Sequence, residues 1–279
     1  MEQGVNYIEI NRNSWNAKTD IHIESKFYDV DGFLKGNNSL KEIELQLLGD
    51  LKGKSILHLQ CHFGQDSISL SRMGAKVTGI DLSDIAIERA KALAEKTNTD
   101  TTFICCDIYD LPNYLNQEFD IVFTSYGTIG WLPDLDKWAE IASRFLKPGG
   151  EFIFAEFHPV IWMYDDDFEK IGYNYFNTGP IIDTYNGTYA EKSANLSQQY
   201  VMWNHGIGEV LNALIKNKMQ NFEIHHISES SLNMYKKCFD ENGSLKKIEN
   251  IKWQFLQNTE ANSFVDIAFD EEKNKTAAI

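Results

Sequence analysis

Residues 56–83 constrain the fold of this chain more than any other stretch. They contain an apolar run over 56–59, a turn around Gly64, a short helical segment and a second apolar run that ends at Asp81. A strand, a tight turn, a helix and a second strand followed by an acid open a nucleotide-type α/β domain. The turn and the helix N-terminus then present backbone N–H groups to a polar ligand.

Asp81 lies roughly 20 residues past the turn, where a carboxylate can accept hydrogen bonds from two ribose hydroxyls. The alternative is that Asp81 only caps the helix that begins near Ser83. Later segments continue the same alternation and favour the ligand role. Strands are predicted over 101–107, 119–126 and 151–157, and helices over 66–73, 83–96 and 134–145.

The turn lacks the G-x-G-x-x-G fingerprint of dinucleotide-binding proteins. The run LHLQCHFGQD over 57–66 resembles instead the first motif of class I S-adenosylmethionine-dependent methyltransferases, Asp/Glu-x-Gly-x-Gly-x-Gly, and in particular a branch of small bacterial methyltransferases. Those motif positions are here His58, Gln60, His62 and Gly64. The run LKPGGEFIF over 146–154 resembles the motif before the fifth strand of the same family, at the spacing typical of it.

The resemblance implies S-adenosylmethionine as cofactor and S-adenosylhomocysteine as product. It implies that Asp81 binds the ribose, and that Asp107 and Ile108 bind the adenine, although Asp107 at a strand end also fits an Asx turn. Asp66 in a first helical turn is expected to attract the ammonium group of the cofactor. The expected cofactor-binding residues are Gln60, Cys61, His62, Gly64, Asp66, Asp81, Leu82, Asp107, Ile108, Ser125 and Tyr126.

The expected fold class is α/β, a Rossmann-like, seven-stranded, doubly wound sheet that is parallel except for one strand. Strands six and seven are expected over 222–228 and 263–269, after a helix over 207–217. One domain over 1–279 is expected, with an N-terminal helical lid (1–50, including a helix over 40–51), a cofactor-binding core (51–157), a substrate-side insertion after strand five (158–204) and a C-terminal part (205–270). A type II turn is predicted over 147–150 and a type I′ hairpin over 184–189.

Methyl transfer from a sulfonium is an in-line displacement in which positioning supplies most of the acceleration. A base is required for a hydroxyl or a weakly acidic N–H, but not for a thiolate or a free amine. Histidine accepts protons near neutral pH, so the catalytic candidates are His158, His205 and His22, with Tyr28 as an orienting donor. A purely structural role is the alternative for each. The aromatic insertion favours a small-molecule acceptor, and oxygen, nitrogen and sulfur all remain open.

Composition excludes several function classes. The chain has 26 Lys and Arg against 41 Asp and Glu, a net charge of −15, which argues against nucleic acid as a substrate. No apolar run approaches the roughly 20 residues of a membrane span, and residues 1–4 do not begin a signal peptide. The four cysteines fit no zinc pattern, so no metal is expected. We expect a reduced cytoplasmic protein, either monomeric or homodimeric.

Two other functions stay open. A non-catalytic S-adenosylmethionine-binding protein can use the same scaffold, and the altered first motif favours this alternative. A nicotinamide-dependent oxidoreductase agrees with Asp81, but the missing glycine fingerprint and the run over 146–154 oppose it.

Overall fold

The computed structural model describes residues 6–165 and 169–224. The chain divides into two compact units. Residues 1–156 and 179–203 form the first unit, which contains the central sheet, and residues 157–178 and 204–279 form the second.

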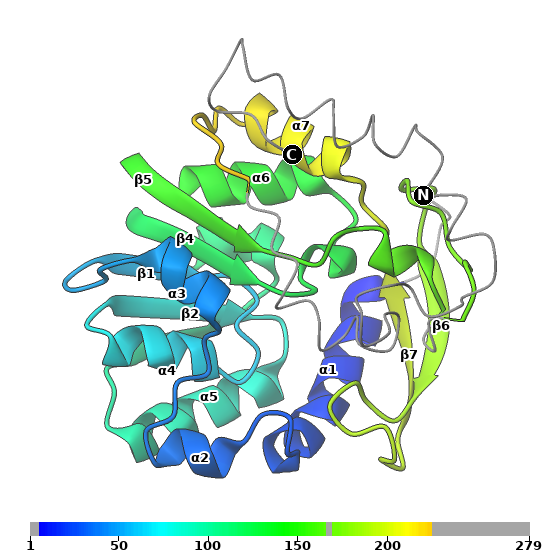
Figure 1. Ribbon diagram of the computed structural model, residues 1–279, viewed down its shortest axis with the longest axis horizontal. Helices are drawn as coiled ribbons and strands as arrows, with labels where there is room; N and C mark the ends of the chain where they lie inside the picture. Colours follow the sequence, from blue (N-terminus) through cyan, green and yellow to red (C-terminus); the bar gives the residue numbers. More distant parts are fainter. Residues whose placement is uncertain (1–5, 166–168, 225–279) are drawn as a thin grey trace, which may run out of the picture. The chain divides into compact units, whose positions relative to one another are not determined.

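The first unit is built on a parallel sheet of five strands (Figure 1). The first strand of the chain lies in the middle of the sheet, the next two lie on one side of it, and the last two lie on its other side. The strand order therefore reverses at the middle strand. In doubly wound sheets the ligand crevice lies outside the carboxyl ends of the strands at such a reversal. The predicted α/β, Rossmann-like architecture is confirmed. In spatial order the strands are β3 (Thr101–Cys105), β2 (Lys76–Asp81), β1 (Ser55–His58), β4 (Phe119–Ser125) and β5 (Leu146–Ala155).

Helices connect these strands and bury the faces of the sheet. On one face, Ile153 of β5 and Ile56 of β1 share a buried cluster with Leu48. On the other face, the fully buried indole of Trp138 packs against Phe152 and Phe154 of β5. Successive apolar side chains of β5 thus point to opposite faces of the sheet, as expected for a strand that is buried on both faces. The helices are α3 (Glu42–Leu48), α4 (Gln65–Arg72), α5 (Asp84–Thr97) and α6 (Leu135–Arg144), with short 3₁₀ segments η1 (Ile108–Asn113) and η2 (Ile129–Trp131).

The helix α5 follows its prediction closely. Ser83 is its N-cap, and the Ser83 hydroxyl oxygen accepts a hydrogen bond from the Ala86 N–H at 3.0 Å. The buried positions form one apolar stripe along the helix, namely Ala86, Ile87, Ala90, Leu93 and Ala94.

The N-terminal segment forms α1 (Tyr7–Glu24) and α2 (Val30–Leu34). The helix α1 contacts α5 and the strand β7 (Ser197–Met202), and Figure 1 shows it between the sheet and that strand. Its side chain at Asn11 completes the backbone pairing of β7, because Nδ2 donates to the Val201 carbonyl at 2.8 Å and Oδ1 accepts from the Val201 N–H at 2.9 Å.

The antiparallel hairpin joins β6 (Ile181–Asn186) to β7. Asn186 pairs with Ser197, so residues 187–196 form the loop, and the predicted tight turn within 184–189 is wrong. A type I′ turn needs positive φ at two successive residues. Gly187 has φ +78° while Asn186 continues the strand.

The positive φ predicted for the second central residue of a type II turn over 147–150 is found at Gly149, but the segment lies inside a strand. The strand β5 begins at Leu146, and its pairing with β4 passes from Phe119–Leu146 to Ile121–Glu151, so residues 147–150 form an irregularity inside the strand. Gly149 has φ +77°, which explains why glycine follows proline there.

The second unit contains η3 (Ile161–Met163) and α7 (Ile207–Lys216), and α7 confirms the helix predicted over 207–217. Of the predicted strand over 222–228, residues 222–224 are not in a strand. The rest of that strand, and all of the strand predicted over 263–269, lie outside the described residues. Within the described ranges, no helix has the length and apolar character needed to cross a membrane.

Candidate functional site

The loop after β1 has an unusual backbone. Gln60, His62 and Gly64 have φ of 53°, 51° and 79°, so every second residue is left-handed. Residues other than glycine rarely adopt this left-handed region of φ and ψ. These three positions are the ones at which the resembled first motif has glycine. The loop therefore keeps positive φ at all three positions, with two side chains added.

The left-handed backbone at Gln60 and His62 predicts that a Gly variant is more stable than an Ala variant at either position, the reverse of the order inside a helix. Gly is expected to be more stable than Ala at either position by about 1 kcal/mol, because only Ala has a Cβ that disfavours positive φ. The comparison of His62→Gly with His62→Ala cancels the lost ring contacts. Urea unfolding measures the difference, and the same pair at Ala92 inside α5 is the control, where Ala should be the more stable. If Ala is also the more stable at 60 and 62, the left-handed geometry is contradicted.

Asp81 holds this loop from the end of β2. Its Oδ2 accepts the His62 N–H at 2.7 Å, and its Oδ1 accepts the Ser83 N–H at 2.8 Å. Burial raises the pKa of Asp81 to about 6, against the effect of the backbone N–H groups of Ser83, His62 and Leu82. A carboxylate has about four acceptor positions, so Asp81 can bind further hydroxyl groups while it holds the loop.

Other predicted cofactor residues lie along the same edge of the sheet. Asp66 is in the first turn of α4, and Asp107 caps η1 by accepting the Tyr109 N–H at 2.9 Å, as the Asx alternative required. Burial raises the pKa of both carboxyls. The Leu82 carbonyl, after β2, accepts from Arg12 Nε at 3.3 Å. Ile108 and Cys61 are buried, and burial raises the pKa of the Cys61 thiol well above its usual value.

The segment after β4 is tied to the first-motif loop. Gln60 Nε2 donates to the Thr128 carbonyl at 2.9 Å. Ser125 ends β4, and Tyr126 follows it with φ 43°. The Tyr126 hydroxyl donates to Glu44 Oε2 at 2.9 Å, and burial raises the pKa of Glu44. The Gln60–Thr128 bond joins the segments after β1 and β4, which flank the reversal of strand order, and the Tyr126–Glu44 bond ties the second segment to α3.

A cluster of rings lies beside the first-motif loop, and we call it the ring cluster. His22 Nδ1 and His62 Nε2 are 2.9 Å apart, and the Tyr28 and Tyr189 hydroxyls are hydrogen-bonded. The structure therefore brings two of the predicted catalytic residues, His22 and Tyr28, next to a predicted loop residue. The members come from α1, its following turn, the loop, η2 and the β6–β7 loop: Trp15, His22, Tyr28, His62, Trp131 and Tyr189.

Both histidines of the ring cluster are neutral at pH 7. Burial lowers the pKa of His22 to about 3, and it lowers the pKa of His62 well below its usual value. One imidazole then donates to the other. Their outer nitrogens, His22 Nε2 and His62 Nδ1, are buried and have no hydrogen-bond partner within residues 6–165 and 169–224. In either tautomer one outer nitrogen carries a proton and the other a lone pair. The two outer nitrogens lie at opposite ends of the hydrogen-bonded pair. A ligand hydroxyl, which both donates and accepts, can therefore satisfy either of them in either tautomer, but one hydroxyl cannot reach both.

The other two catalytic candidates belong to the second unit. His158 Nδ1 accepts the Val160 N–H at 3.3 Å. His205 is 3% exposed, and its Nδ1 lies 3.0 Å from Glu209 Oε1 on α7. A catalytic role for either residue stays a prediction.

Lys18 is the residue that the sequence reasoning missed. It lies on α1 and is 6% exposed, with Nζ 5.1 Å from the ring centroid of Trp15 and 5.4 Å from that of Trp131. Burial lowers its pKa to about 8. The available signal was the helical spacing of polar residues over 11–22, since the buried residues of α1 are Asn11, Ser14, Lys18, Thr19 and His22.

Comparisons with known proteins agree with this geometry. Residues 56–150 match a family model described as a methyltransferase domain. The ubiquinone biosynthesis O-methyltransferase of Coxiella burnetii is 36% identical over 116 residues, 42% of this chain and 48% of that protein. The corresponding protein of Alkalilimnicola ehrlichii is 30% identical over 135 residues, 47% of this chain and 54% of that protein. The chain spans about half the length of these curated relatives.

Solved structures extend the likeness beyond the matched segment. The geranyl diphosphate C-methyltransferase of Streptomyces coelicolor A3(2) superposes with a TM-score of 0.55 at 16% identity, covering 85% of this chain and 88% of that one. An S-adenosylmethionine-dependent methyltransferase of Mesorhizobium loti gives 0.51 at 18% identity, covering 76% and 95%. This chain therefore has the α/β fold of S-adenosylmethionine-dependent methyltransferases, and its residues 56–150 match their methyltransferase domain.

Proposed function

We propose that this protein transfers a methyl group from S-adenosylmethionine to a small-molecule acceptor. The observation that carries the proposal is the first-motif loop. Its positive φ at Gln60, His62 and Gly64, and its attachment to Asp81, reproduce with other side chains the backbone that a glycine motif permits. The loop lies inside the segment that matches a methyltransferase domain.

The polar groups at this edge of the sheet fit the cofactor. S-adenosylmethionine offers hydrogen-bond donors in its ammonium group, its two ribose hydroxyls and its adenine amino group. The edge offers acceptors, including Gln60 Oε1, which is buried and has no partner in the part of the chain that the structure describes. We assign Asp81 to the ribose, Asp107 with Ile108 to the adenine, and Asp66 with Gln60 to the ammonium. Cys61, His62, Gly64, Leu82, Ser125 and Tyr126 complete the proposed site.

The same groups oppose a nicotinamide cofactor. Its pyrophosphate binds at the turn after the first strand, against a helix N-terminus. Here that first turn carries the carboxylate of Asp66, and residues 60–66 contain no Lys or Arg. The two negative charges of the pyrophosphate would lie next to the carboxylate of Asp66, with no cation in that segment to offset them.

The cofactor supplies an electrophilic methyl group on a sulfonium. The chain supplies position and the exclusion of water, because α1 is locked to β7 through Asn11 and places Trp15 against Trp131. We propose that the outer nitrogen of His22 holds an acceptor hydroxyl, with Tyr28 as an orienting donor. A general base works best with a pKa near the working pH. The low pKa of His22 therefore favours an acceptor that loses its proton easily.

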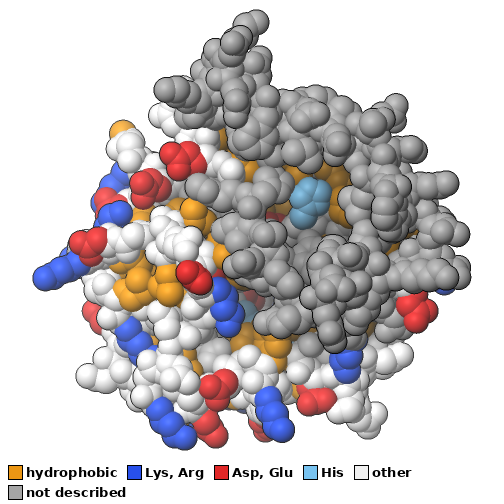
Figure 2. All heavy atoms as spheres, in the orientation of Figure 1, with side chains coloured by type: hydrophobic (Ala, Val, Ile, Leu, Met, Phe, Trp, Pro, Cys, Tyr) orange, Lys and Arg blue, Asp and Glu red, His pale blue; other side chains and the backbone are white. Residues whose placement is uncertain are grey.

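We also propose the finer organisation expected from the family resemblance. Residues 1–50 act as a lid, 51–157 as the cofactor-binding core, 158–204 as a substrate-side insertion and 205–270 as the part that completes seven strands, within one domain of the small bacterial branch. The relatives are named O-methyltransferases of ubiquinone biosynthesis, which supports a small organic acceptor. Charges of both signs are interspersed on the described face in Figure 2, which agrees with an acceptor other than nucleic acid.

Isothermal titration with S-adenosylmethionine, S-adenosylhomocysteine and NAD tests the proposal. We expect micromolar binding of the first two and no binding of NAD. Phenols, thiols and amines are then screened for methylation by mass spectrometry. Binding without methylation of any acceptor favours the non-catalytic alternative, and a preference for NAD contradicts the proposal.

A further inference from the structure

Lys18 is a buried cation for which the described part of the chain supplies no charged partner. No carboxylate in the described ranges lies within ion-pairing distance of Nζ, and the lowered pKa of Lys18 has burial as its cause. Asp20 is the carboxylate of α1 that is nearest to Lys18 in the sequence. Its Oδ1 accepts from Arg89 Nε at 2.7 Å. At pH 7 a pKa of about 8 leaves the amine mostly protonated.

The surroundings of Lys18 offset only part of the cost of burying a charge. Two indole faces attract the ammonium through cation–π contacts. Such contacts supply no hydrogen-bond acceptor for the three N–H donors of the amine. A buried charge is ordinarily paired, because an unpaired one is costly. The described residues supply no such pairing group, and we expect it to come from a ligand.

The position of Lys18 connects it to the ring cluster. The indole of Trp15 lies 5.1 Å from Lys18 Nζ and 6.2 Å from the ring of His22, each measured to the Trp15 centroid. A cation and an imidazole nitrogen, His22 Nε2, which has no partner among the described residues, thus lie around one indole. A flat molecule that carries an anionic group and a hydroxyl matches this arrangement, because the indole offers a flat apolar surface between the two polar groups.

We propose that the methyl acceptor is an aromatic hydroxy acid whose anionic group pairs with Lys18 and whose hydroxyl binds at the outer nitrogen of His22. This inference rests on the proposed methyltransferase function and names the class of its acceptor. Lys18 acts as a specificity-determining residue, and the methyl transfer itself is unchanged.

The test compares an acid with its neutral amide. 4-Hydroxybenzoate and 4-hydroxybenzamide are titrated into protein saturated with S-adenosylhomocysteine, and tryptophan fluorescence and calorimetry report binding. The wild type is expected to bind the acid at least tenfold more tightly than the amide. Lys18→Met should reduce this preference to within about twofold, because it keeps the length of the side chain and removes the charge, whereas Lys18→Arg should retain it.

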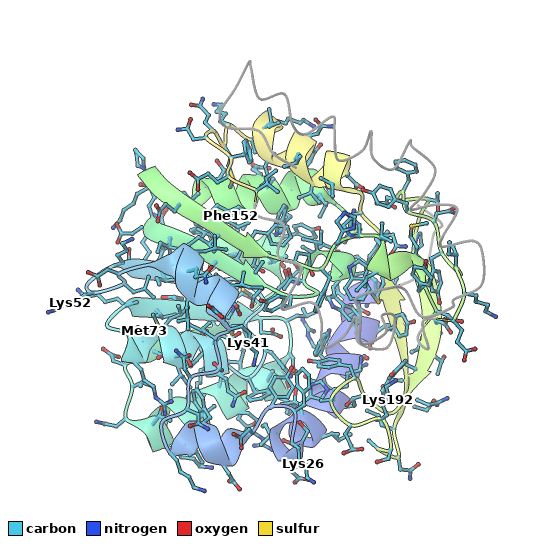
Figure 3. The ribbon with its side chains drawn as sticks, viewed as in Figure 1. Lys26, Lys41, Lys52, Met73, Phe152 and Lys192 are labelled. Carbon is cyan, nitrogen blue, oxygen red and sulfur yellow. The ribbon has the colours of Figure 1, made fainter. Side chains whose placement is uncertain are left out.

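Lys26→Met is the matched control. Lys26 is exposed and lies just beyond the end of α1, where Figure 3 labels it, so this variant should keep the wild-type preference. Thermal unfolding without ligand gives a second readout. Lys18→Met should be at least as stable as the wild type, since an apolar side chain replaces an unpaired buried charge.

The outcomes separate the two proposals. Equal affinity for acid and amide, a preference that survives Lys18→Met, or no binding of the acid overturns the role of Lys18, while S-adenosylhomocysteine binding in the same titrations leaves the methyltransferase proposal standing. If the wild type does not bind S-adenosylhomocysteine, both proposals fail.

Discussion

Asp81→Asn is expected to weaken the binding of S-adenosylhomocysteine by at least about 100-fold, close to 3 kcal/mol. The carboxylate accepts the His62 and Ser83 N–H groups, one on each oxygen. An amide has one oxygen, so its NH₂ group would face one of these donors. The variant therefore loses both the loop attachment and the proposed ribose contact, and hydrogen bonds to charged groups are the stronger ones. The core strands remain, so circular dichroism should show an intact fold.

A second ligand separates the two effects at Asp81. S-adenosylhomocysteine and its 2′-deoxyribose analogue are titrated into the wild type and the variant. If Asp81 binds the ribose, the wild type should prefer the complete ligand and Asp81→Asn should lose that preference. An equal loss for both ligands would mean that Asp81 acts through the loop alone. Asp84→Asn is the matched control, because Asp84 is exposed and lies three residues further along the chain.

The sheet was predictable where local patterns and buried faces agree. The strands over 56–59 and 119–126, and the stripe of α5, are apolar because they fill the core of the sheet. The hairpin was mispredicted because Asn186-Gly187 is a strong turn signal that the structure uses differently. Gly187 begins a ten-residue loop, and its N–H donates to the Leu196 carbonyl at 2.7 Å.

The helix α1 shows why part of the site escaped prediction. Apolar periodicity identifies a helix that packs on a core, but the buried residues of α1 are polar. Asn11 pairs with β7, His22 reaches His62, and Lys18 lies between two indoles. These side chains are buried because of contacts with residues far away in the sequence. Their polar pattern in the sequence is typical of an exposed segment.

The first-motif loop shows the opposite case. Its residues depart from the family pattern, but the backbone conformation associated with glycine persists at Gln60 and His62. The hydrogen bonds that stabilise it come from Asp81 and Thr128. These partners are 19 and 68 residues away in the sequence, so the loop alone does not reveal them.

Acidification is expected to destabilise the fold strongly. His58 and His22 are buried, and burial lowers the pKa of each to about 3. Both stay neutral in the folded state, whereas the unfolded chain protonates them below about pH 6.5. Stability is therefore lost as the pH falls from about 6.5 toward 3. Each histidine should cost about 2 kcal/mol of the free energy of unfolding between pH 7 and pH 5.

Asp81 acts in the opposite direction over part of this range. Its pKa of about 6 lies above the unfolded value, so the folded state takes up its proton first as the pH falls. Between pH 7 and pH 5 this protonation adds about 1 kcal/mol to the free energy of unfolding. With His62 also held neutral by burial, the contribution of the three histidines is larger than that of Asp81.

His58→Asn isolates one contribution. The position corresponds to the acid of the resembled motif, and His58 Nδ1 lies 2.8 Å from the Ser67 hydroxyl oxygen. Asn offers a polar atom at the equivalent place in the side chain but does not titrate. The variant should be less stable at pH 7, because it loses ring contact with Phe123. Urea unfolding at constant ionic strength should nevertheless show about 2 kcal/mol less acid destabilisation between pH 7 and pH 5 than the wild type. Parallel stability curves for the two proteins would show that His58 is not held neutral by burial.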